Sequence, residues 1–388
     1  QIIAQGWLVL QLTGSATALG TVTALQTLPT LLLGPYGGVI ADRVDKRRLL
    51  IAMKAAMGVF ALALGLLTTT GAVQLWQVYL LALGLGLATC VESPARQAFV
   101  LEMVGPDHLR NAVSLNSVLV NAARAVGPAV AGIVIAVGGL GICYLINAAS
   151  FVVVVAMLLR MDVAALQPSP PAPRAPGQLR EGFRYVRGNP RLSVPLLMMA
   201  LVGCLTYEFQ VVLPIVASQT FHGDSATYGF LTAAMGAGAV VGGLFVAARG
   251  RTGIRPLTLT ALAYGVTMTA VALAPDLMVA LIGMALVGAA SVAFMASGNS
   301  TLQLEAAPHM RGRVMALWTV AFLGSTPIGG PIAGVVSQQF GGRAGLALGA
   351  VACFLAAGIG ALLLRRQPAE TTATATPAVA TDPEPASP

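Results

Sequence analysis

Two long apolar runs flank a short charged segment near the start of the chain. Residues 17–41 carry no charge and residues 49–70 carry only Lys54, whereas the segment from Asp42 to Arg48 holds six charges. Each run is long enough to cross a hydrocarbon core of about 30 Å as a helix, and runs of this length that cross are helical. Because Lys and Arg in short connections stay in the cytoplasm, this loop is predicted to face inward.

The composition indicates a polytopic membrane protein. Of 388 residues, 56% are hydrophobic and 9% are charged, whereas about a quarter of the residues of a soluble protein are charged. The net charge of +8 does not indicate nucleic-acid binding, because the basic residues lie in short clusters between apolar runs. Neither metal-ligand spacing nor a C-x-x-C motif occurs around Cys90, Cys143, Cys204 and Cys353, so we predict no disulfide, metal or cofactor.

The order of the apolar runs predicts an all-α membrane protein with twelve transmembrane helices in two six-helix pseudo-repeats. Residues 1–13 are apolar but too short to span, and the chain begins at Gln1, so we expect the start of the first helix to be missing. Pro94 should kink the fourth helix. The predicted helices cover residues 1–13, 17–41, 49–70, 75–104, 109–137, 140–160, 192–220, 226–248, 256–274, 277–305, 311–339 and 342–364.

Four parts of the chain follow from this layout. A six-helix bundle at 1–161 precedes a cytosolic Pro-rich linker with an amphipathic helix at 162–190, a second bundle at 191–366 and a disordered tail at 367–388. The amphipathic helix at 179–187 should lie on the inner leaflet, and the end of a disordered linker is the alternative.

The distribution of basic residues predicts the orientation of the chain. Of the 22 Lys and Arg residues, only Arg343 falls in a predicted outer loop and only Arg124 lies deep inside a helix. The others lie on or near the inner side, so both termini are expected in the cytoplasm.

An internal repeat supports two related halves. Gly127-Pro128 in the fifth helix recurs as Gly330-Pro331 in the eleventh. The same offset in residue number relates two charged pairs, which are Glu102 with Glu305 and Arg110 with Arg313. Such parallel repeats place a substrate site between the halves near the membrane midplane.

The charged loop resembles the signature of the major facilitator superfamily, G-x-L-A-D-R-x-G-R-K/R, between its second and third helices. The matching residues are Gly38, Asp42, Arg43, Lys46 and Arg47. Asp45 stands where the family usually has a second Gly. The resemblance implies a gating loop in which Asp42 pairs with Arg43, Arg47 or Arg96 in one state of a transport cycle. A plain topology anchor is the alternative.

Further motifs resemble the enterobactin-exporter-like, drug-efflux branch of that superfamily. They are Pro94-Ala-Arg96-Gln-Ala98, Arg124-Ala-Val-Gly127-Pro128, and Tyr228-Gly229 followed by the residues from Ala233 to Gly238. The Gly-Pro element also resembles the motif of antiporters, although Ala123 replaces its first Gly, and simple helix packing is an equal alternative. The resemblance implies export of a siderophore or drug-like molecule across the bacterial cytoplasmic (inner) membrane by proton antiport.

Three charged residues are predicted inside the hydrocarbon, where a charge survives mainly beside a partner or in a wet cavity. Glu92 lies before the predicted turn at Asp107, and Arg124 lies after it by nearly the same number of residues. In an antiparallel pair of helices the two side chains therefore reach similar depth, and we predict that they pair. This pair would either join two helices or take part in coupling. Glu208 has no basic residue within a turn or two and precedes Pro214. It is the preferred site for proton coupling, and a wet carboxyl near the outer surface is the alternative.

Polar residues within the apolar runs are candidates to line a substrate cavity, or else to bond a neighbouring helix. They are Gln5, Gln11, Gln26, Asn121, Asn299 and Gln303.

The sequence has no Ser/His/Asp set and no G-x-x-x-x-G-K-[ST] loop, so neither an enzyme nor an ATP-driven pump is predicted. The expected partners are a small-molecule substrate, protons and the lipid bilayer, with the protein as a monomer. Two other functions stay open, namely proton-coupled uptake and a receptor that kept the fold but lost transport.

Overall fold

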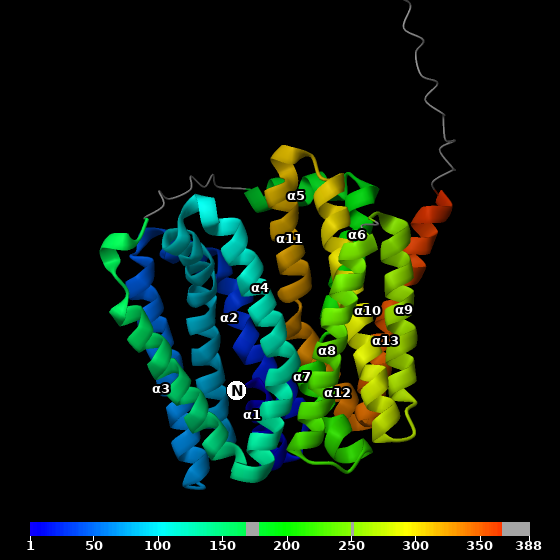
Figure 1. The fold of residues 1–388 in the computed structure, drawn as a ribbon. Helices are drawn as coiled ribbons and strands as arrows, with labels where there is room; N and C mark the ends of the chain where they lie inside the picture. Colours follow the sequence, from blue (N-terminus) through cyan, green and yellow to red (C-terminus); the bar gives the residue numbers. More distant parts are fainter. Residues whose placement is uncertain (168–177, 250–251, 367–388) are drawn as a thin grey trace, which may run out of the picture.

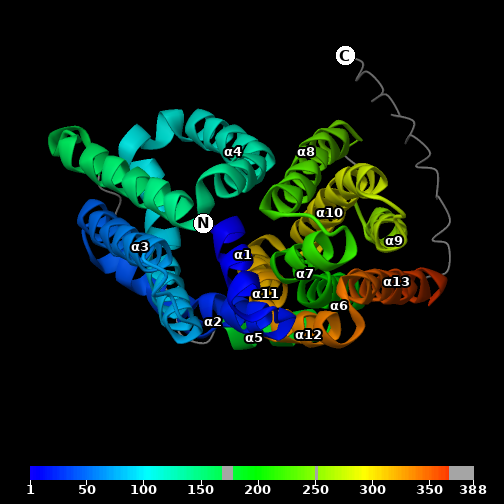
Figure 2. The ribbon, with the colours of Figure 1, turned by 90° about the horizontal axis from the view of Figure 1, so that it is seen from below.

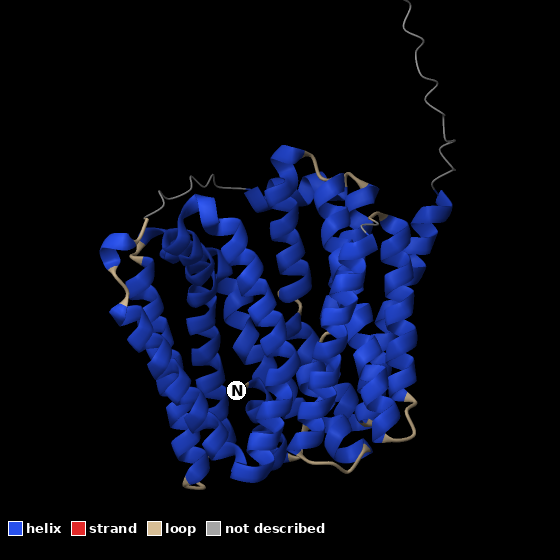
Figure 3. Ribbon diagram, viewed as in Figure 1, coloured by secondary structure: helices blue, strands red, loops and turns tan. Residues whose placement is uncertain are grey.

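The computed structural model describes residues 1–167, 178–249 and 252–366, and these residues fold almost entirely into helices (Figure 3). The N-terminal half, residues 1–167, contains α1 (Ile2–Thr13), α2 (Ala16–Arg43), α3 (Lys46–Thr69), α4 (Leu75–Arg160) and the short 3₁₀ turn η1 (Val163–Ala165). The C-terminal half, residues 178–366, begins with α5 (Gln178–Arg187), α6 (Pro190–Leu205), α7 (Phe209–Ile215) and the π turn η2 (Val216–Thr220). It continues with α8 (Ser225–Arg249), α9 (Ile254–Ala272), α10 (Leu277–Glu305), η3 (Pro308–Met310), α11 (Arg311–Leu323), α12 (Thr326–Phe340) and α13 (Gly342–Arg366).

The long element α4 reverses direction twice. Gly105 and Gly139 have φ of 71° and 83°, a conformation that glycine adopts readily and that interrupts the helix. Three segments result, at residues 75–104, 106–138 and 140–160, which we call the first, middle and last segments of α4. These reversals fall at the turns predicted near residues 105–108 and 138–139.

Two crossings of the C-terminal half are broken. α6, α7 and η2 form one crossing, interrupted around Thr206 to Glu208, and α11 and α12 form another, interrupted at Gly324-Ser325. With α4 counted as three, the described residues form twelve helical passes along the bundle, as predicted, and the first of them, α1, has only 12 residues. Nine helical stretches in these ranges are long and apolar enough to span a membrane by length and composition, and the stretch 118–160 covers two crossings. The all-α membrane fold is confirmed.

Local capping explains where several helices begin. The Ser15 hydroxyl accepts a hydrogen bond from the N–H of Ala18, and the Asp276 carboxylate accepts one from Val279. The Asp45 carboxylate accepts from the N–H of Arg48 and thereby caps α3. The Asp that departs from the loop signature is therefore the N-cap of the third helix.

The two halves stand side by side (Figures 1 and 2). One end of the bundle carries the loops rich in Lys and Arg, including residues 43–48 and 305–313, and lies at the top of Figure 1; we call it the basic end. The other end carries the short turns at Gly14, Gly71 and Gly341, and we call it the opposite end.

The amphipathic helix α5 lies across the basic end beside α11 (Figure 1). Val186 is buried, the Tyr185 hydroxyl accepts a hydrogen bond from the N–H of Ala307, and Glu181 pairs with Arg313 over 2.6 Å. The side of α5 that carries Tyr185 and Val186 thus packs against the rest of the protein, while Phe183 is exposed. The predicted linker residues 168–177 and the predicted tail 367–388 lie outside the described residues.

Candidate functional site

The most extensive contacts between the two halves are made by two pairs of helices. The first pair is α2 and α12. A Cβ at Gly20 would clash with the Gly330 carbonyl, and one at Gly334 would lie 2.7 Å from the Ala16 carbonyl oxygen. The Ala16 N–H also donates to Oε1 of Gln338 over 2.6 Å. Because these residues lack bulky side chains, the two backbones approach closely. We call this the α2–α12 contact.

The second pair is α8 and the middle segment of α4. A Cβ at Gly229 would lie 2.6 Å from the Pro128 carbonyl oxygen, and one at Gly236 would lie 2.6 Å from the Arg124 carbonyl oxygen. Among the described glycines of α8, Gly236 is the last to meet α4 on the way to the basic end, since Gly243 meets only Val292 of α10.

Both predicted Gly-Pro motifs lie at these contacts. The Pro128 carbonyl meets α8, and Gly330 meets the Gly20 carbonyl, so each motif packs one half against the other. Gly127 has open space where a side chain would be, and Pro331 lies inside α12 without ending it.

Toward the basic end the halves separate. On α2, nothing lies within 4 Å of a Cβ placed at Gly34. The molecule is therefore closed at the opposite end and open at the basic end.

Glu208 lies at the break between α6 and α7, just inside the α2–α12 contact. Its side chain is 2% exposed, and Oε1 has no hydrogen-bond partner. A Cβ at Gly329 would lie 2.9 Å from this oxygen, and one at Gly330 would lie 3.5 Å from Oε2. Thr326 is the side chain that faces the carboxyl group. No Lys or Arg of the described residues pairs with Glu208, and the carboxyl group is buried rather than at the surface. Its role in proton coupling stays a prediction.

Neighbouring bonds hold this break in place. The Thr206 hydroxyl donates to the Gly349 carbonyl over 3.0 Å, and the Tyr207 hydroxyl donates to the Ser291 carbonyl over 2.8 Å. The Tyr207 ring also meets Phe322 edge-on. Sequence reasoning treated Tyr207 only as a neighbour of Glu208, because its partners lie on other helices, far away in the chain.

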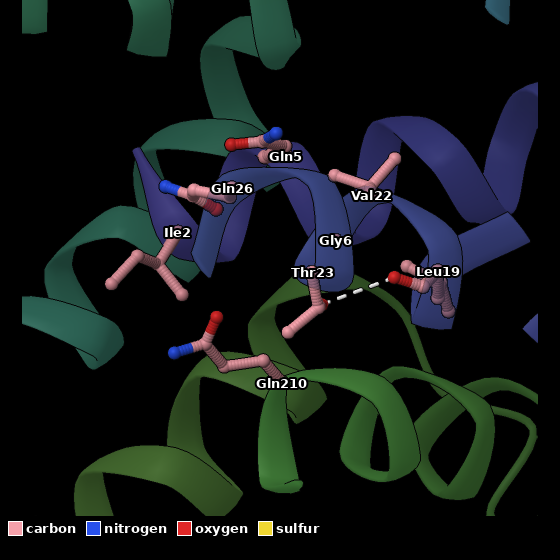
Figure 4. A pocket seen from close by; sticks show the side chains of 8 residues that line it. All are labelled: Ile2, Gln5, Gly6, Leu19, Val22, Thr23, Gln26 and Gln210. Atoms are coloured by element: carbon pink, nitrogen blue, oxygen red, sulfur yellow. Dashed lines mark hydrogen bonds between the residues drawn. The ribbon is translucent and has the colours of Figure 1, made fainter. Parts of the chain in front are cut away.

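A small cavity of about 10 Å³ lies between α1, α2 and α7 (Figure 4). Gln5, Gln26 and Gln210 project around it from these three helices, together with Thr23. Gln5 is 3% exposed, and neither atom of its amide has a hydrogen-bond partner. The predicted cavity residues Gln5 and Gln26 are thus brought together, and Gln210 and Thr23 were missed.

The other predicted cavity residues lie elsewhere. Gln11 and Gln303 are exposed, and the Gln303 amide donates to Asn299 one turn earlier in α10. The side chain of Asn121 lies outside the described part of the structure.

The predicted pair of Glu92 and Arg124 is wrong. Glu92 is 5% exposed, and its Oε1 lies 2.8 Å from Nζ of Lys54 in α3 and 3.1 Å from Nε of Arg96 in its own segment. Arg124 is exposed and pairs with no acid of the described residues. We call Glu92, Lys54 and Arg96 the Glu92 cluster.

The loop between α2 and α3 is tied to the rest of the N-terminal half. Lys46 pairs with Glu102 over 2.6 Å. Arg47 donates to the carbonyls of Leu158 and Leu159 and so caps the last segment of α4.

The remaining residues of the predicted gate are less defined. Arg43 is exposed. The side chain of Asp42 and the surroundings of Gly38 lie outside the described part of the structure. Within the described residues, Arg47 and Arg96 bind other groups.

Comparison with known proteins identifies the chain. The pattern of the family described as transmembrane secretion effectors, within the major facilitator superfamily, matches residues 1–386. The chain is a transporter of this family. It is 26% identical to the enterobactin exporter EntS of Escherichia coli O1:K1 over 77% of this chain and 71% of that protein. It is also 26% identical to the staphyloferrin A transporter of Staphylococcus aureus over 62% of this chain, and the match spans 60% of that relative.

Solved structures confirm the fold of this transporter. The nucleoside transporter NupG matches with a TM-score of 0.75 and 13% identity, covering 94% of this chain and 95% of NupG. A bacterial homologue of the lysosomal transporter Spinster, in an inward-facing and unoccupied conformation, matches with a TM-score of 0.72 and 16% identity over 94% of both chains. The family and its relatives are transporters rather than enzymes.

Proposed function

We propose that this transporter exports a small amphipathic molecule, a siderophore or drug-like compound, by alternating access coupled to inward proton flow. The substrate class and the direction rest on the similarity to exporters of enterobactin and to a staphyloferrin A transporter. The proposed location is the bacterial inner membrane, with a monomer as the working unit.

The orientation follows from charge. The basic end carries the short loops with Lys and Arg, which supports a cytoplasmic position for this end and for both termini of the protein. The open basic end then receives substrate from the cytoplasm, and the closed opposite end separates it from the outside. The six-helix bundles at 1–161 and 191–366 are the two bodies that rock, and Asp42 with Arg43 belongs to the gate at the cytoplasmic end.

Glu208 is the proposed proton-binding residue, and its surroundings are the main support for proton coupling. A carboxyl group without a positive partner in low dielectric favours its neutral form, and hydration favours its charged form. Opening the α2–α12 contact would admit water to Glu208, because Gly329 and Gly330 of that contact lie directly against its oxygens. Protonation of one side chain and opening of the outer end are therefore linked.

Inside-out vesicles with an acidic lumen test the direction. An exporter accumulates substrate in such vesicles, whereas an uptake symporter releases it into the medium, and a receptor binds without flux. A panel of siderophores and drug-like compounds, including enterobactin, staphyloferrin A and ethidium, provides the substrates. Collapse of the proton gradient should abolish accumulation, and accumulation that persists without a gradient would remove proton coupling from the proposal.

A further inference from the structure

Arg124 is the intramembrane charge that the transport cycle proposed above leaves unused. It lies just past the middle of the segment 106–138, so it sits near the centre of the bundle. Its side chain is exposed and has no acidic partner among the described residues. Helix α8, which packs against this segment at Arg124, contains no Asp or Glu, and Glu92 and Glu102 of the first segment of α4 are bound to Lys54, Arg96 and Lys46. A bare cation at this depth is costly unless it faces water or a ligand.

The face of the helix on which Arg124 lies points to the interior. Exposed apolar residues mark the lipid side of this segment, and they are Leu115, Val118, Leu119, Val126, Val130, Ile133 and Val137. At about 100° per residue, Arg124 lies roughly 160° from the middle of that stripe. Ile135, three turns further on nearly the same face as Arg124, is buried in the cluster that contains Ile3 of α1. Arg124 therefore faces the space between the halves.

The depth of Arg124 coincides with the place where the halves part. Its carbonyl oxygen makes the contact with Gly236, after which the described glycines of α8 no longer meet α4. A molecule that entered between the halves from the basic end would reach the depth of Arg124 where this contact begins.

Arg96, another arginine of the N-terminal half, differs from Arg124 because it has an acidic partner. Arg96 is bound to Glu92, which also binds Lys54. Glu208 is covered by Gly329 and Gly330. Of these intramembrane charges, Arg124 alone is both exposed and unpaired within the described residues.

We propose that Arg124 binds the transported molecule and that this molecule carries an anionic oxygen group, a carboxylate or a catecholate. A guanidinium presents a planar fork of N–H donors that matches two adjacent oxygens, and an ionised partner makes these hydrogen bonds strong. Chelators that bind Fe(III) use such oxygens. The inference rests on the proposed function and narrows its substrate class to anions.

Binding measurements on the purified full chain in lipid nanodiscs test this inference. The probes are iron-free staphyloferrin A and enterobactin as acidic ligands, with ethidium as the cation. Arg124→Gln should weaken binding of at least one acidic probe by about tenfold or more, as expected for a lost charged hydrogen bond, and Arg124→Lys should weaken it less. Ethidium binding should not fall. Arg187→Gln, a change at an exposed arginine of α5, is the matched control and should leave all three affinities unchanged.

Several outcomes would overturn the inference. They are unchanged affinity of Arg124→Gln for the acidic probes, an equal loss for ethidium, and no binding of either acidic probe by the native protein. Unfolding in detergent checks that each variant is folded. The assay uses no gradient, so a failure of proton-driven export and a failure of anion recognition are seen separately.

Discussion

Two buried glutamates, one in each half, have nearly the same exposure and opposite electrostatic surroundings. Glu92 is 5% exposed and Glu208 is 2% exposed. Glu92 lies between Lys54 and Arg96, whereas Glu208 has an unpartnered oxygen and no cation of the described residues beside it. Lys54 and Arg96 balance the charge of the Glu92 carboxylate, whereas no Lys or Arg of the described residues lies beside Glu208 to do so. Burial therefore does not distinguish the two glutamates, but the presence or absence of a charged partner does.

The two glutamates also differ in which parts of the molecule surround them. Glu92 belongs to a cluster within the N-terminal half, and its partner Lys54 comes from α3. Glu208 lies against glycines of α12 that meet α2 of the other half. Of these two carboxyl groups, only that of Glu208 lies beside a contact between the halves.

The largest expected effect is at Glu208. Glu208→Gln mimics the protonated form and should abolish gradient-driven export while leaving substrate exchange without a gradient largely intact. Measurements of concentrative transport and of exchange in proteoliposomes distinguish the two. Glu305→Gln, at an exposed carboxyl of α10, is the control and should retain both activities. Export by Glu208→Gln at the native rate, with unchanged dependence on external pH, would remove Glu208 as the proton site.

The next prediction concerns the α2–α12 contact. Gly20→Val should hold this contact open, because a side chain there clashes with the Gly330 carbonyl. Export should then fall severalfold, and labelling of Glu208 by a hydrophilic carbodiimide should rise, while labelling of Glu92 stays unchanged. Gly34→Val in the same helix has open space and is the matched control. Equal labelling of Glu208 in both variants would show that access to this residue does not depend on the α2–α12 contact.

A smaller effect is expected within the Glu92 cluster. Lys54→Gln should lower the free energy of unfolding by about 2–3 kcal/mol, because it leaves a buried carboxylate with one partner. The double variant Lys54→Gln with Glu92→Gln should lose less than the sum of the single changes. Unfolding in mixed detergent micelles measures all three. Simple additivity would mean that the two charges do not interact.

The smallest expected effect is the coupling between Glu92 and Arg124. Because the two residues do not pair, the losses of unfolding free energy in Glu92→Gln and Arg124→Gln should add within about 0.5 kcal/mol. The same unfolding assay applies. A coupling energy well above that value would restore the pair predicted from sequence.

The error over Glu92 shows how far spacing arguments reach. Glu92 and Arg124 lie at similar distances from the turn at Asp107, so they have similar depth. Lys54 and Glu92 likewise lie at similar distances on either side of the turn at Gly71, at the opposite end. Equal rise per residue makes both pairs possible. Sequence spacing measures depth along the membrane normal, but it does not say which helix faces which.

The isolation of Glu208 was predictable for a related reason. No basic residue lies near it in sequence, and the C-terminal half has few charges within its apolar runs. Its contact with Gly329 was not predictable, because these two residues lie far apart in the chain and meet only through the break in each crossing.

The sequence by itself determined the twelve crossings, the turns at Gly105 and Gly139, and the basic and opposite ends of the bundle. These depend on hydrophobicity, charge and backbone freedom within short stretches of chain, so local residues suffice to specify them. Only the tertiary structure decided that Lys54 pairs with Glu92, that Arg124 faces the open space between the halves, and that Glu208 lies beneath the α2–α12 contact. Each of these depends on the rotation and neighbours of helices far apart in the chain, which the packing of the whole bundle sets.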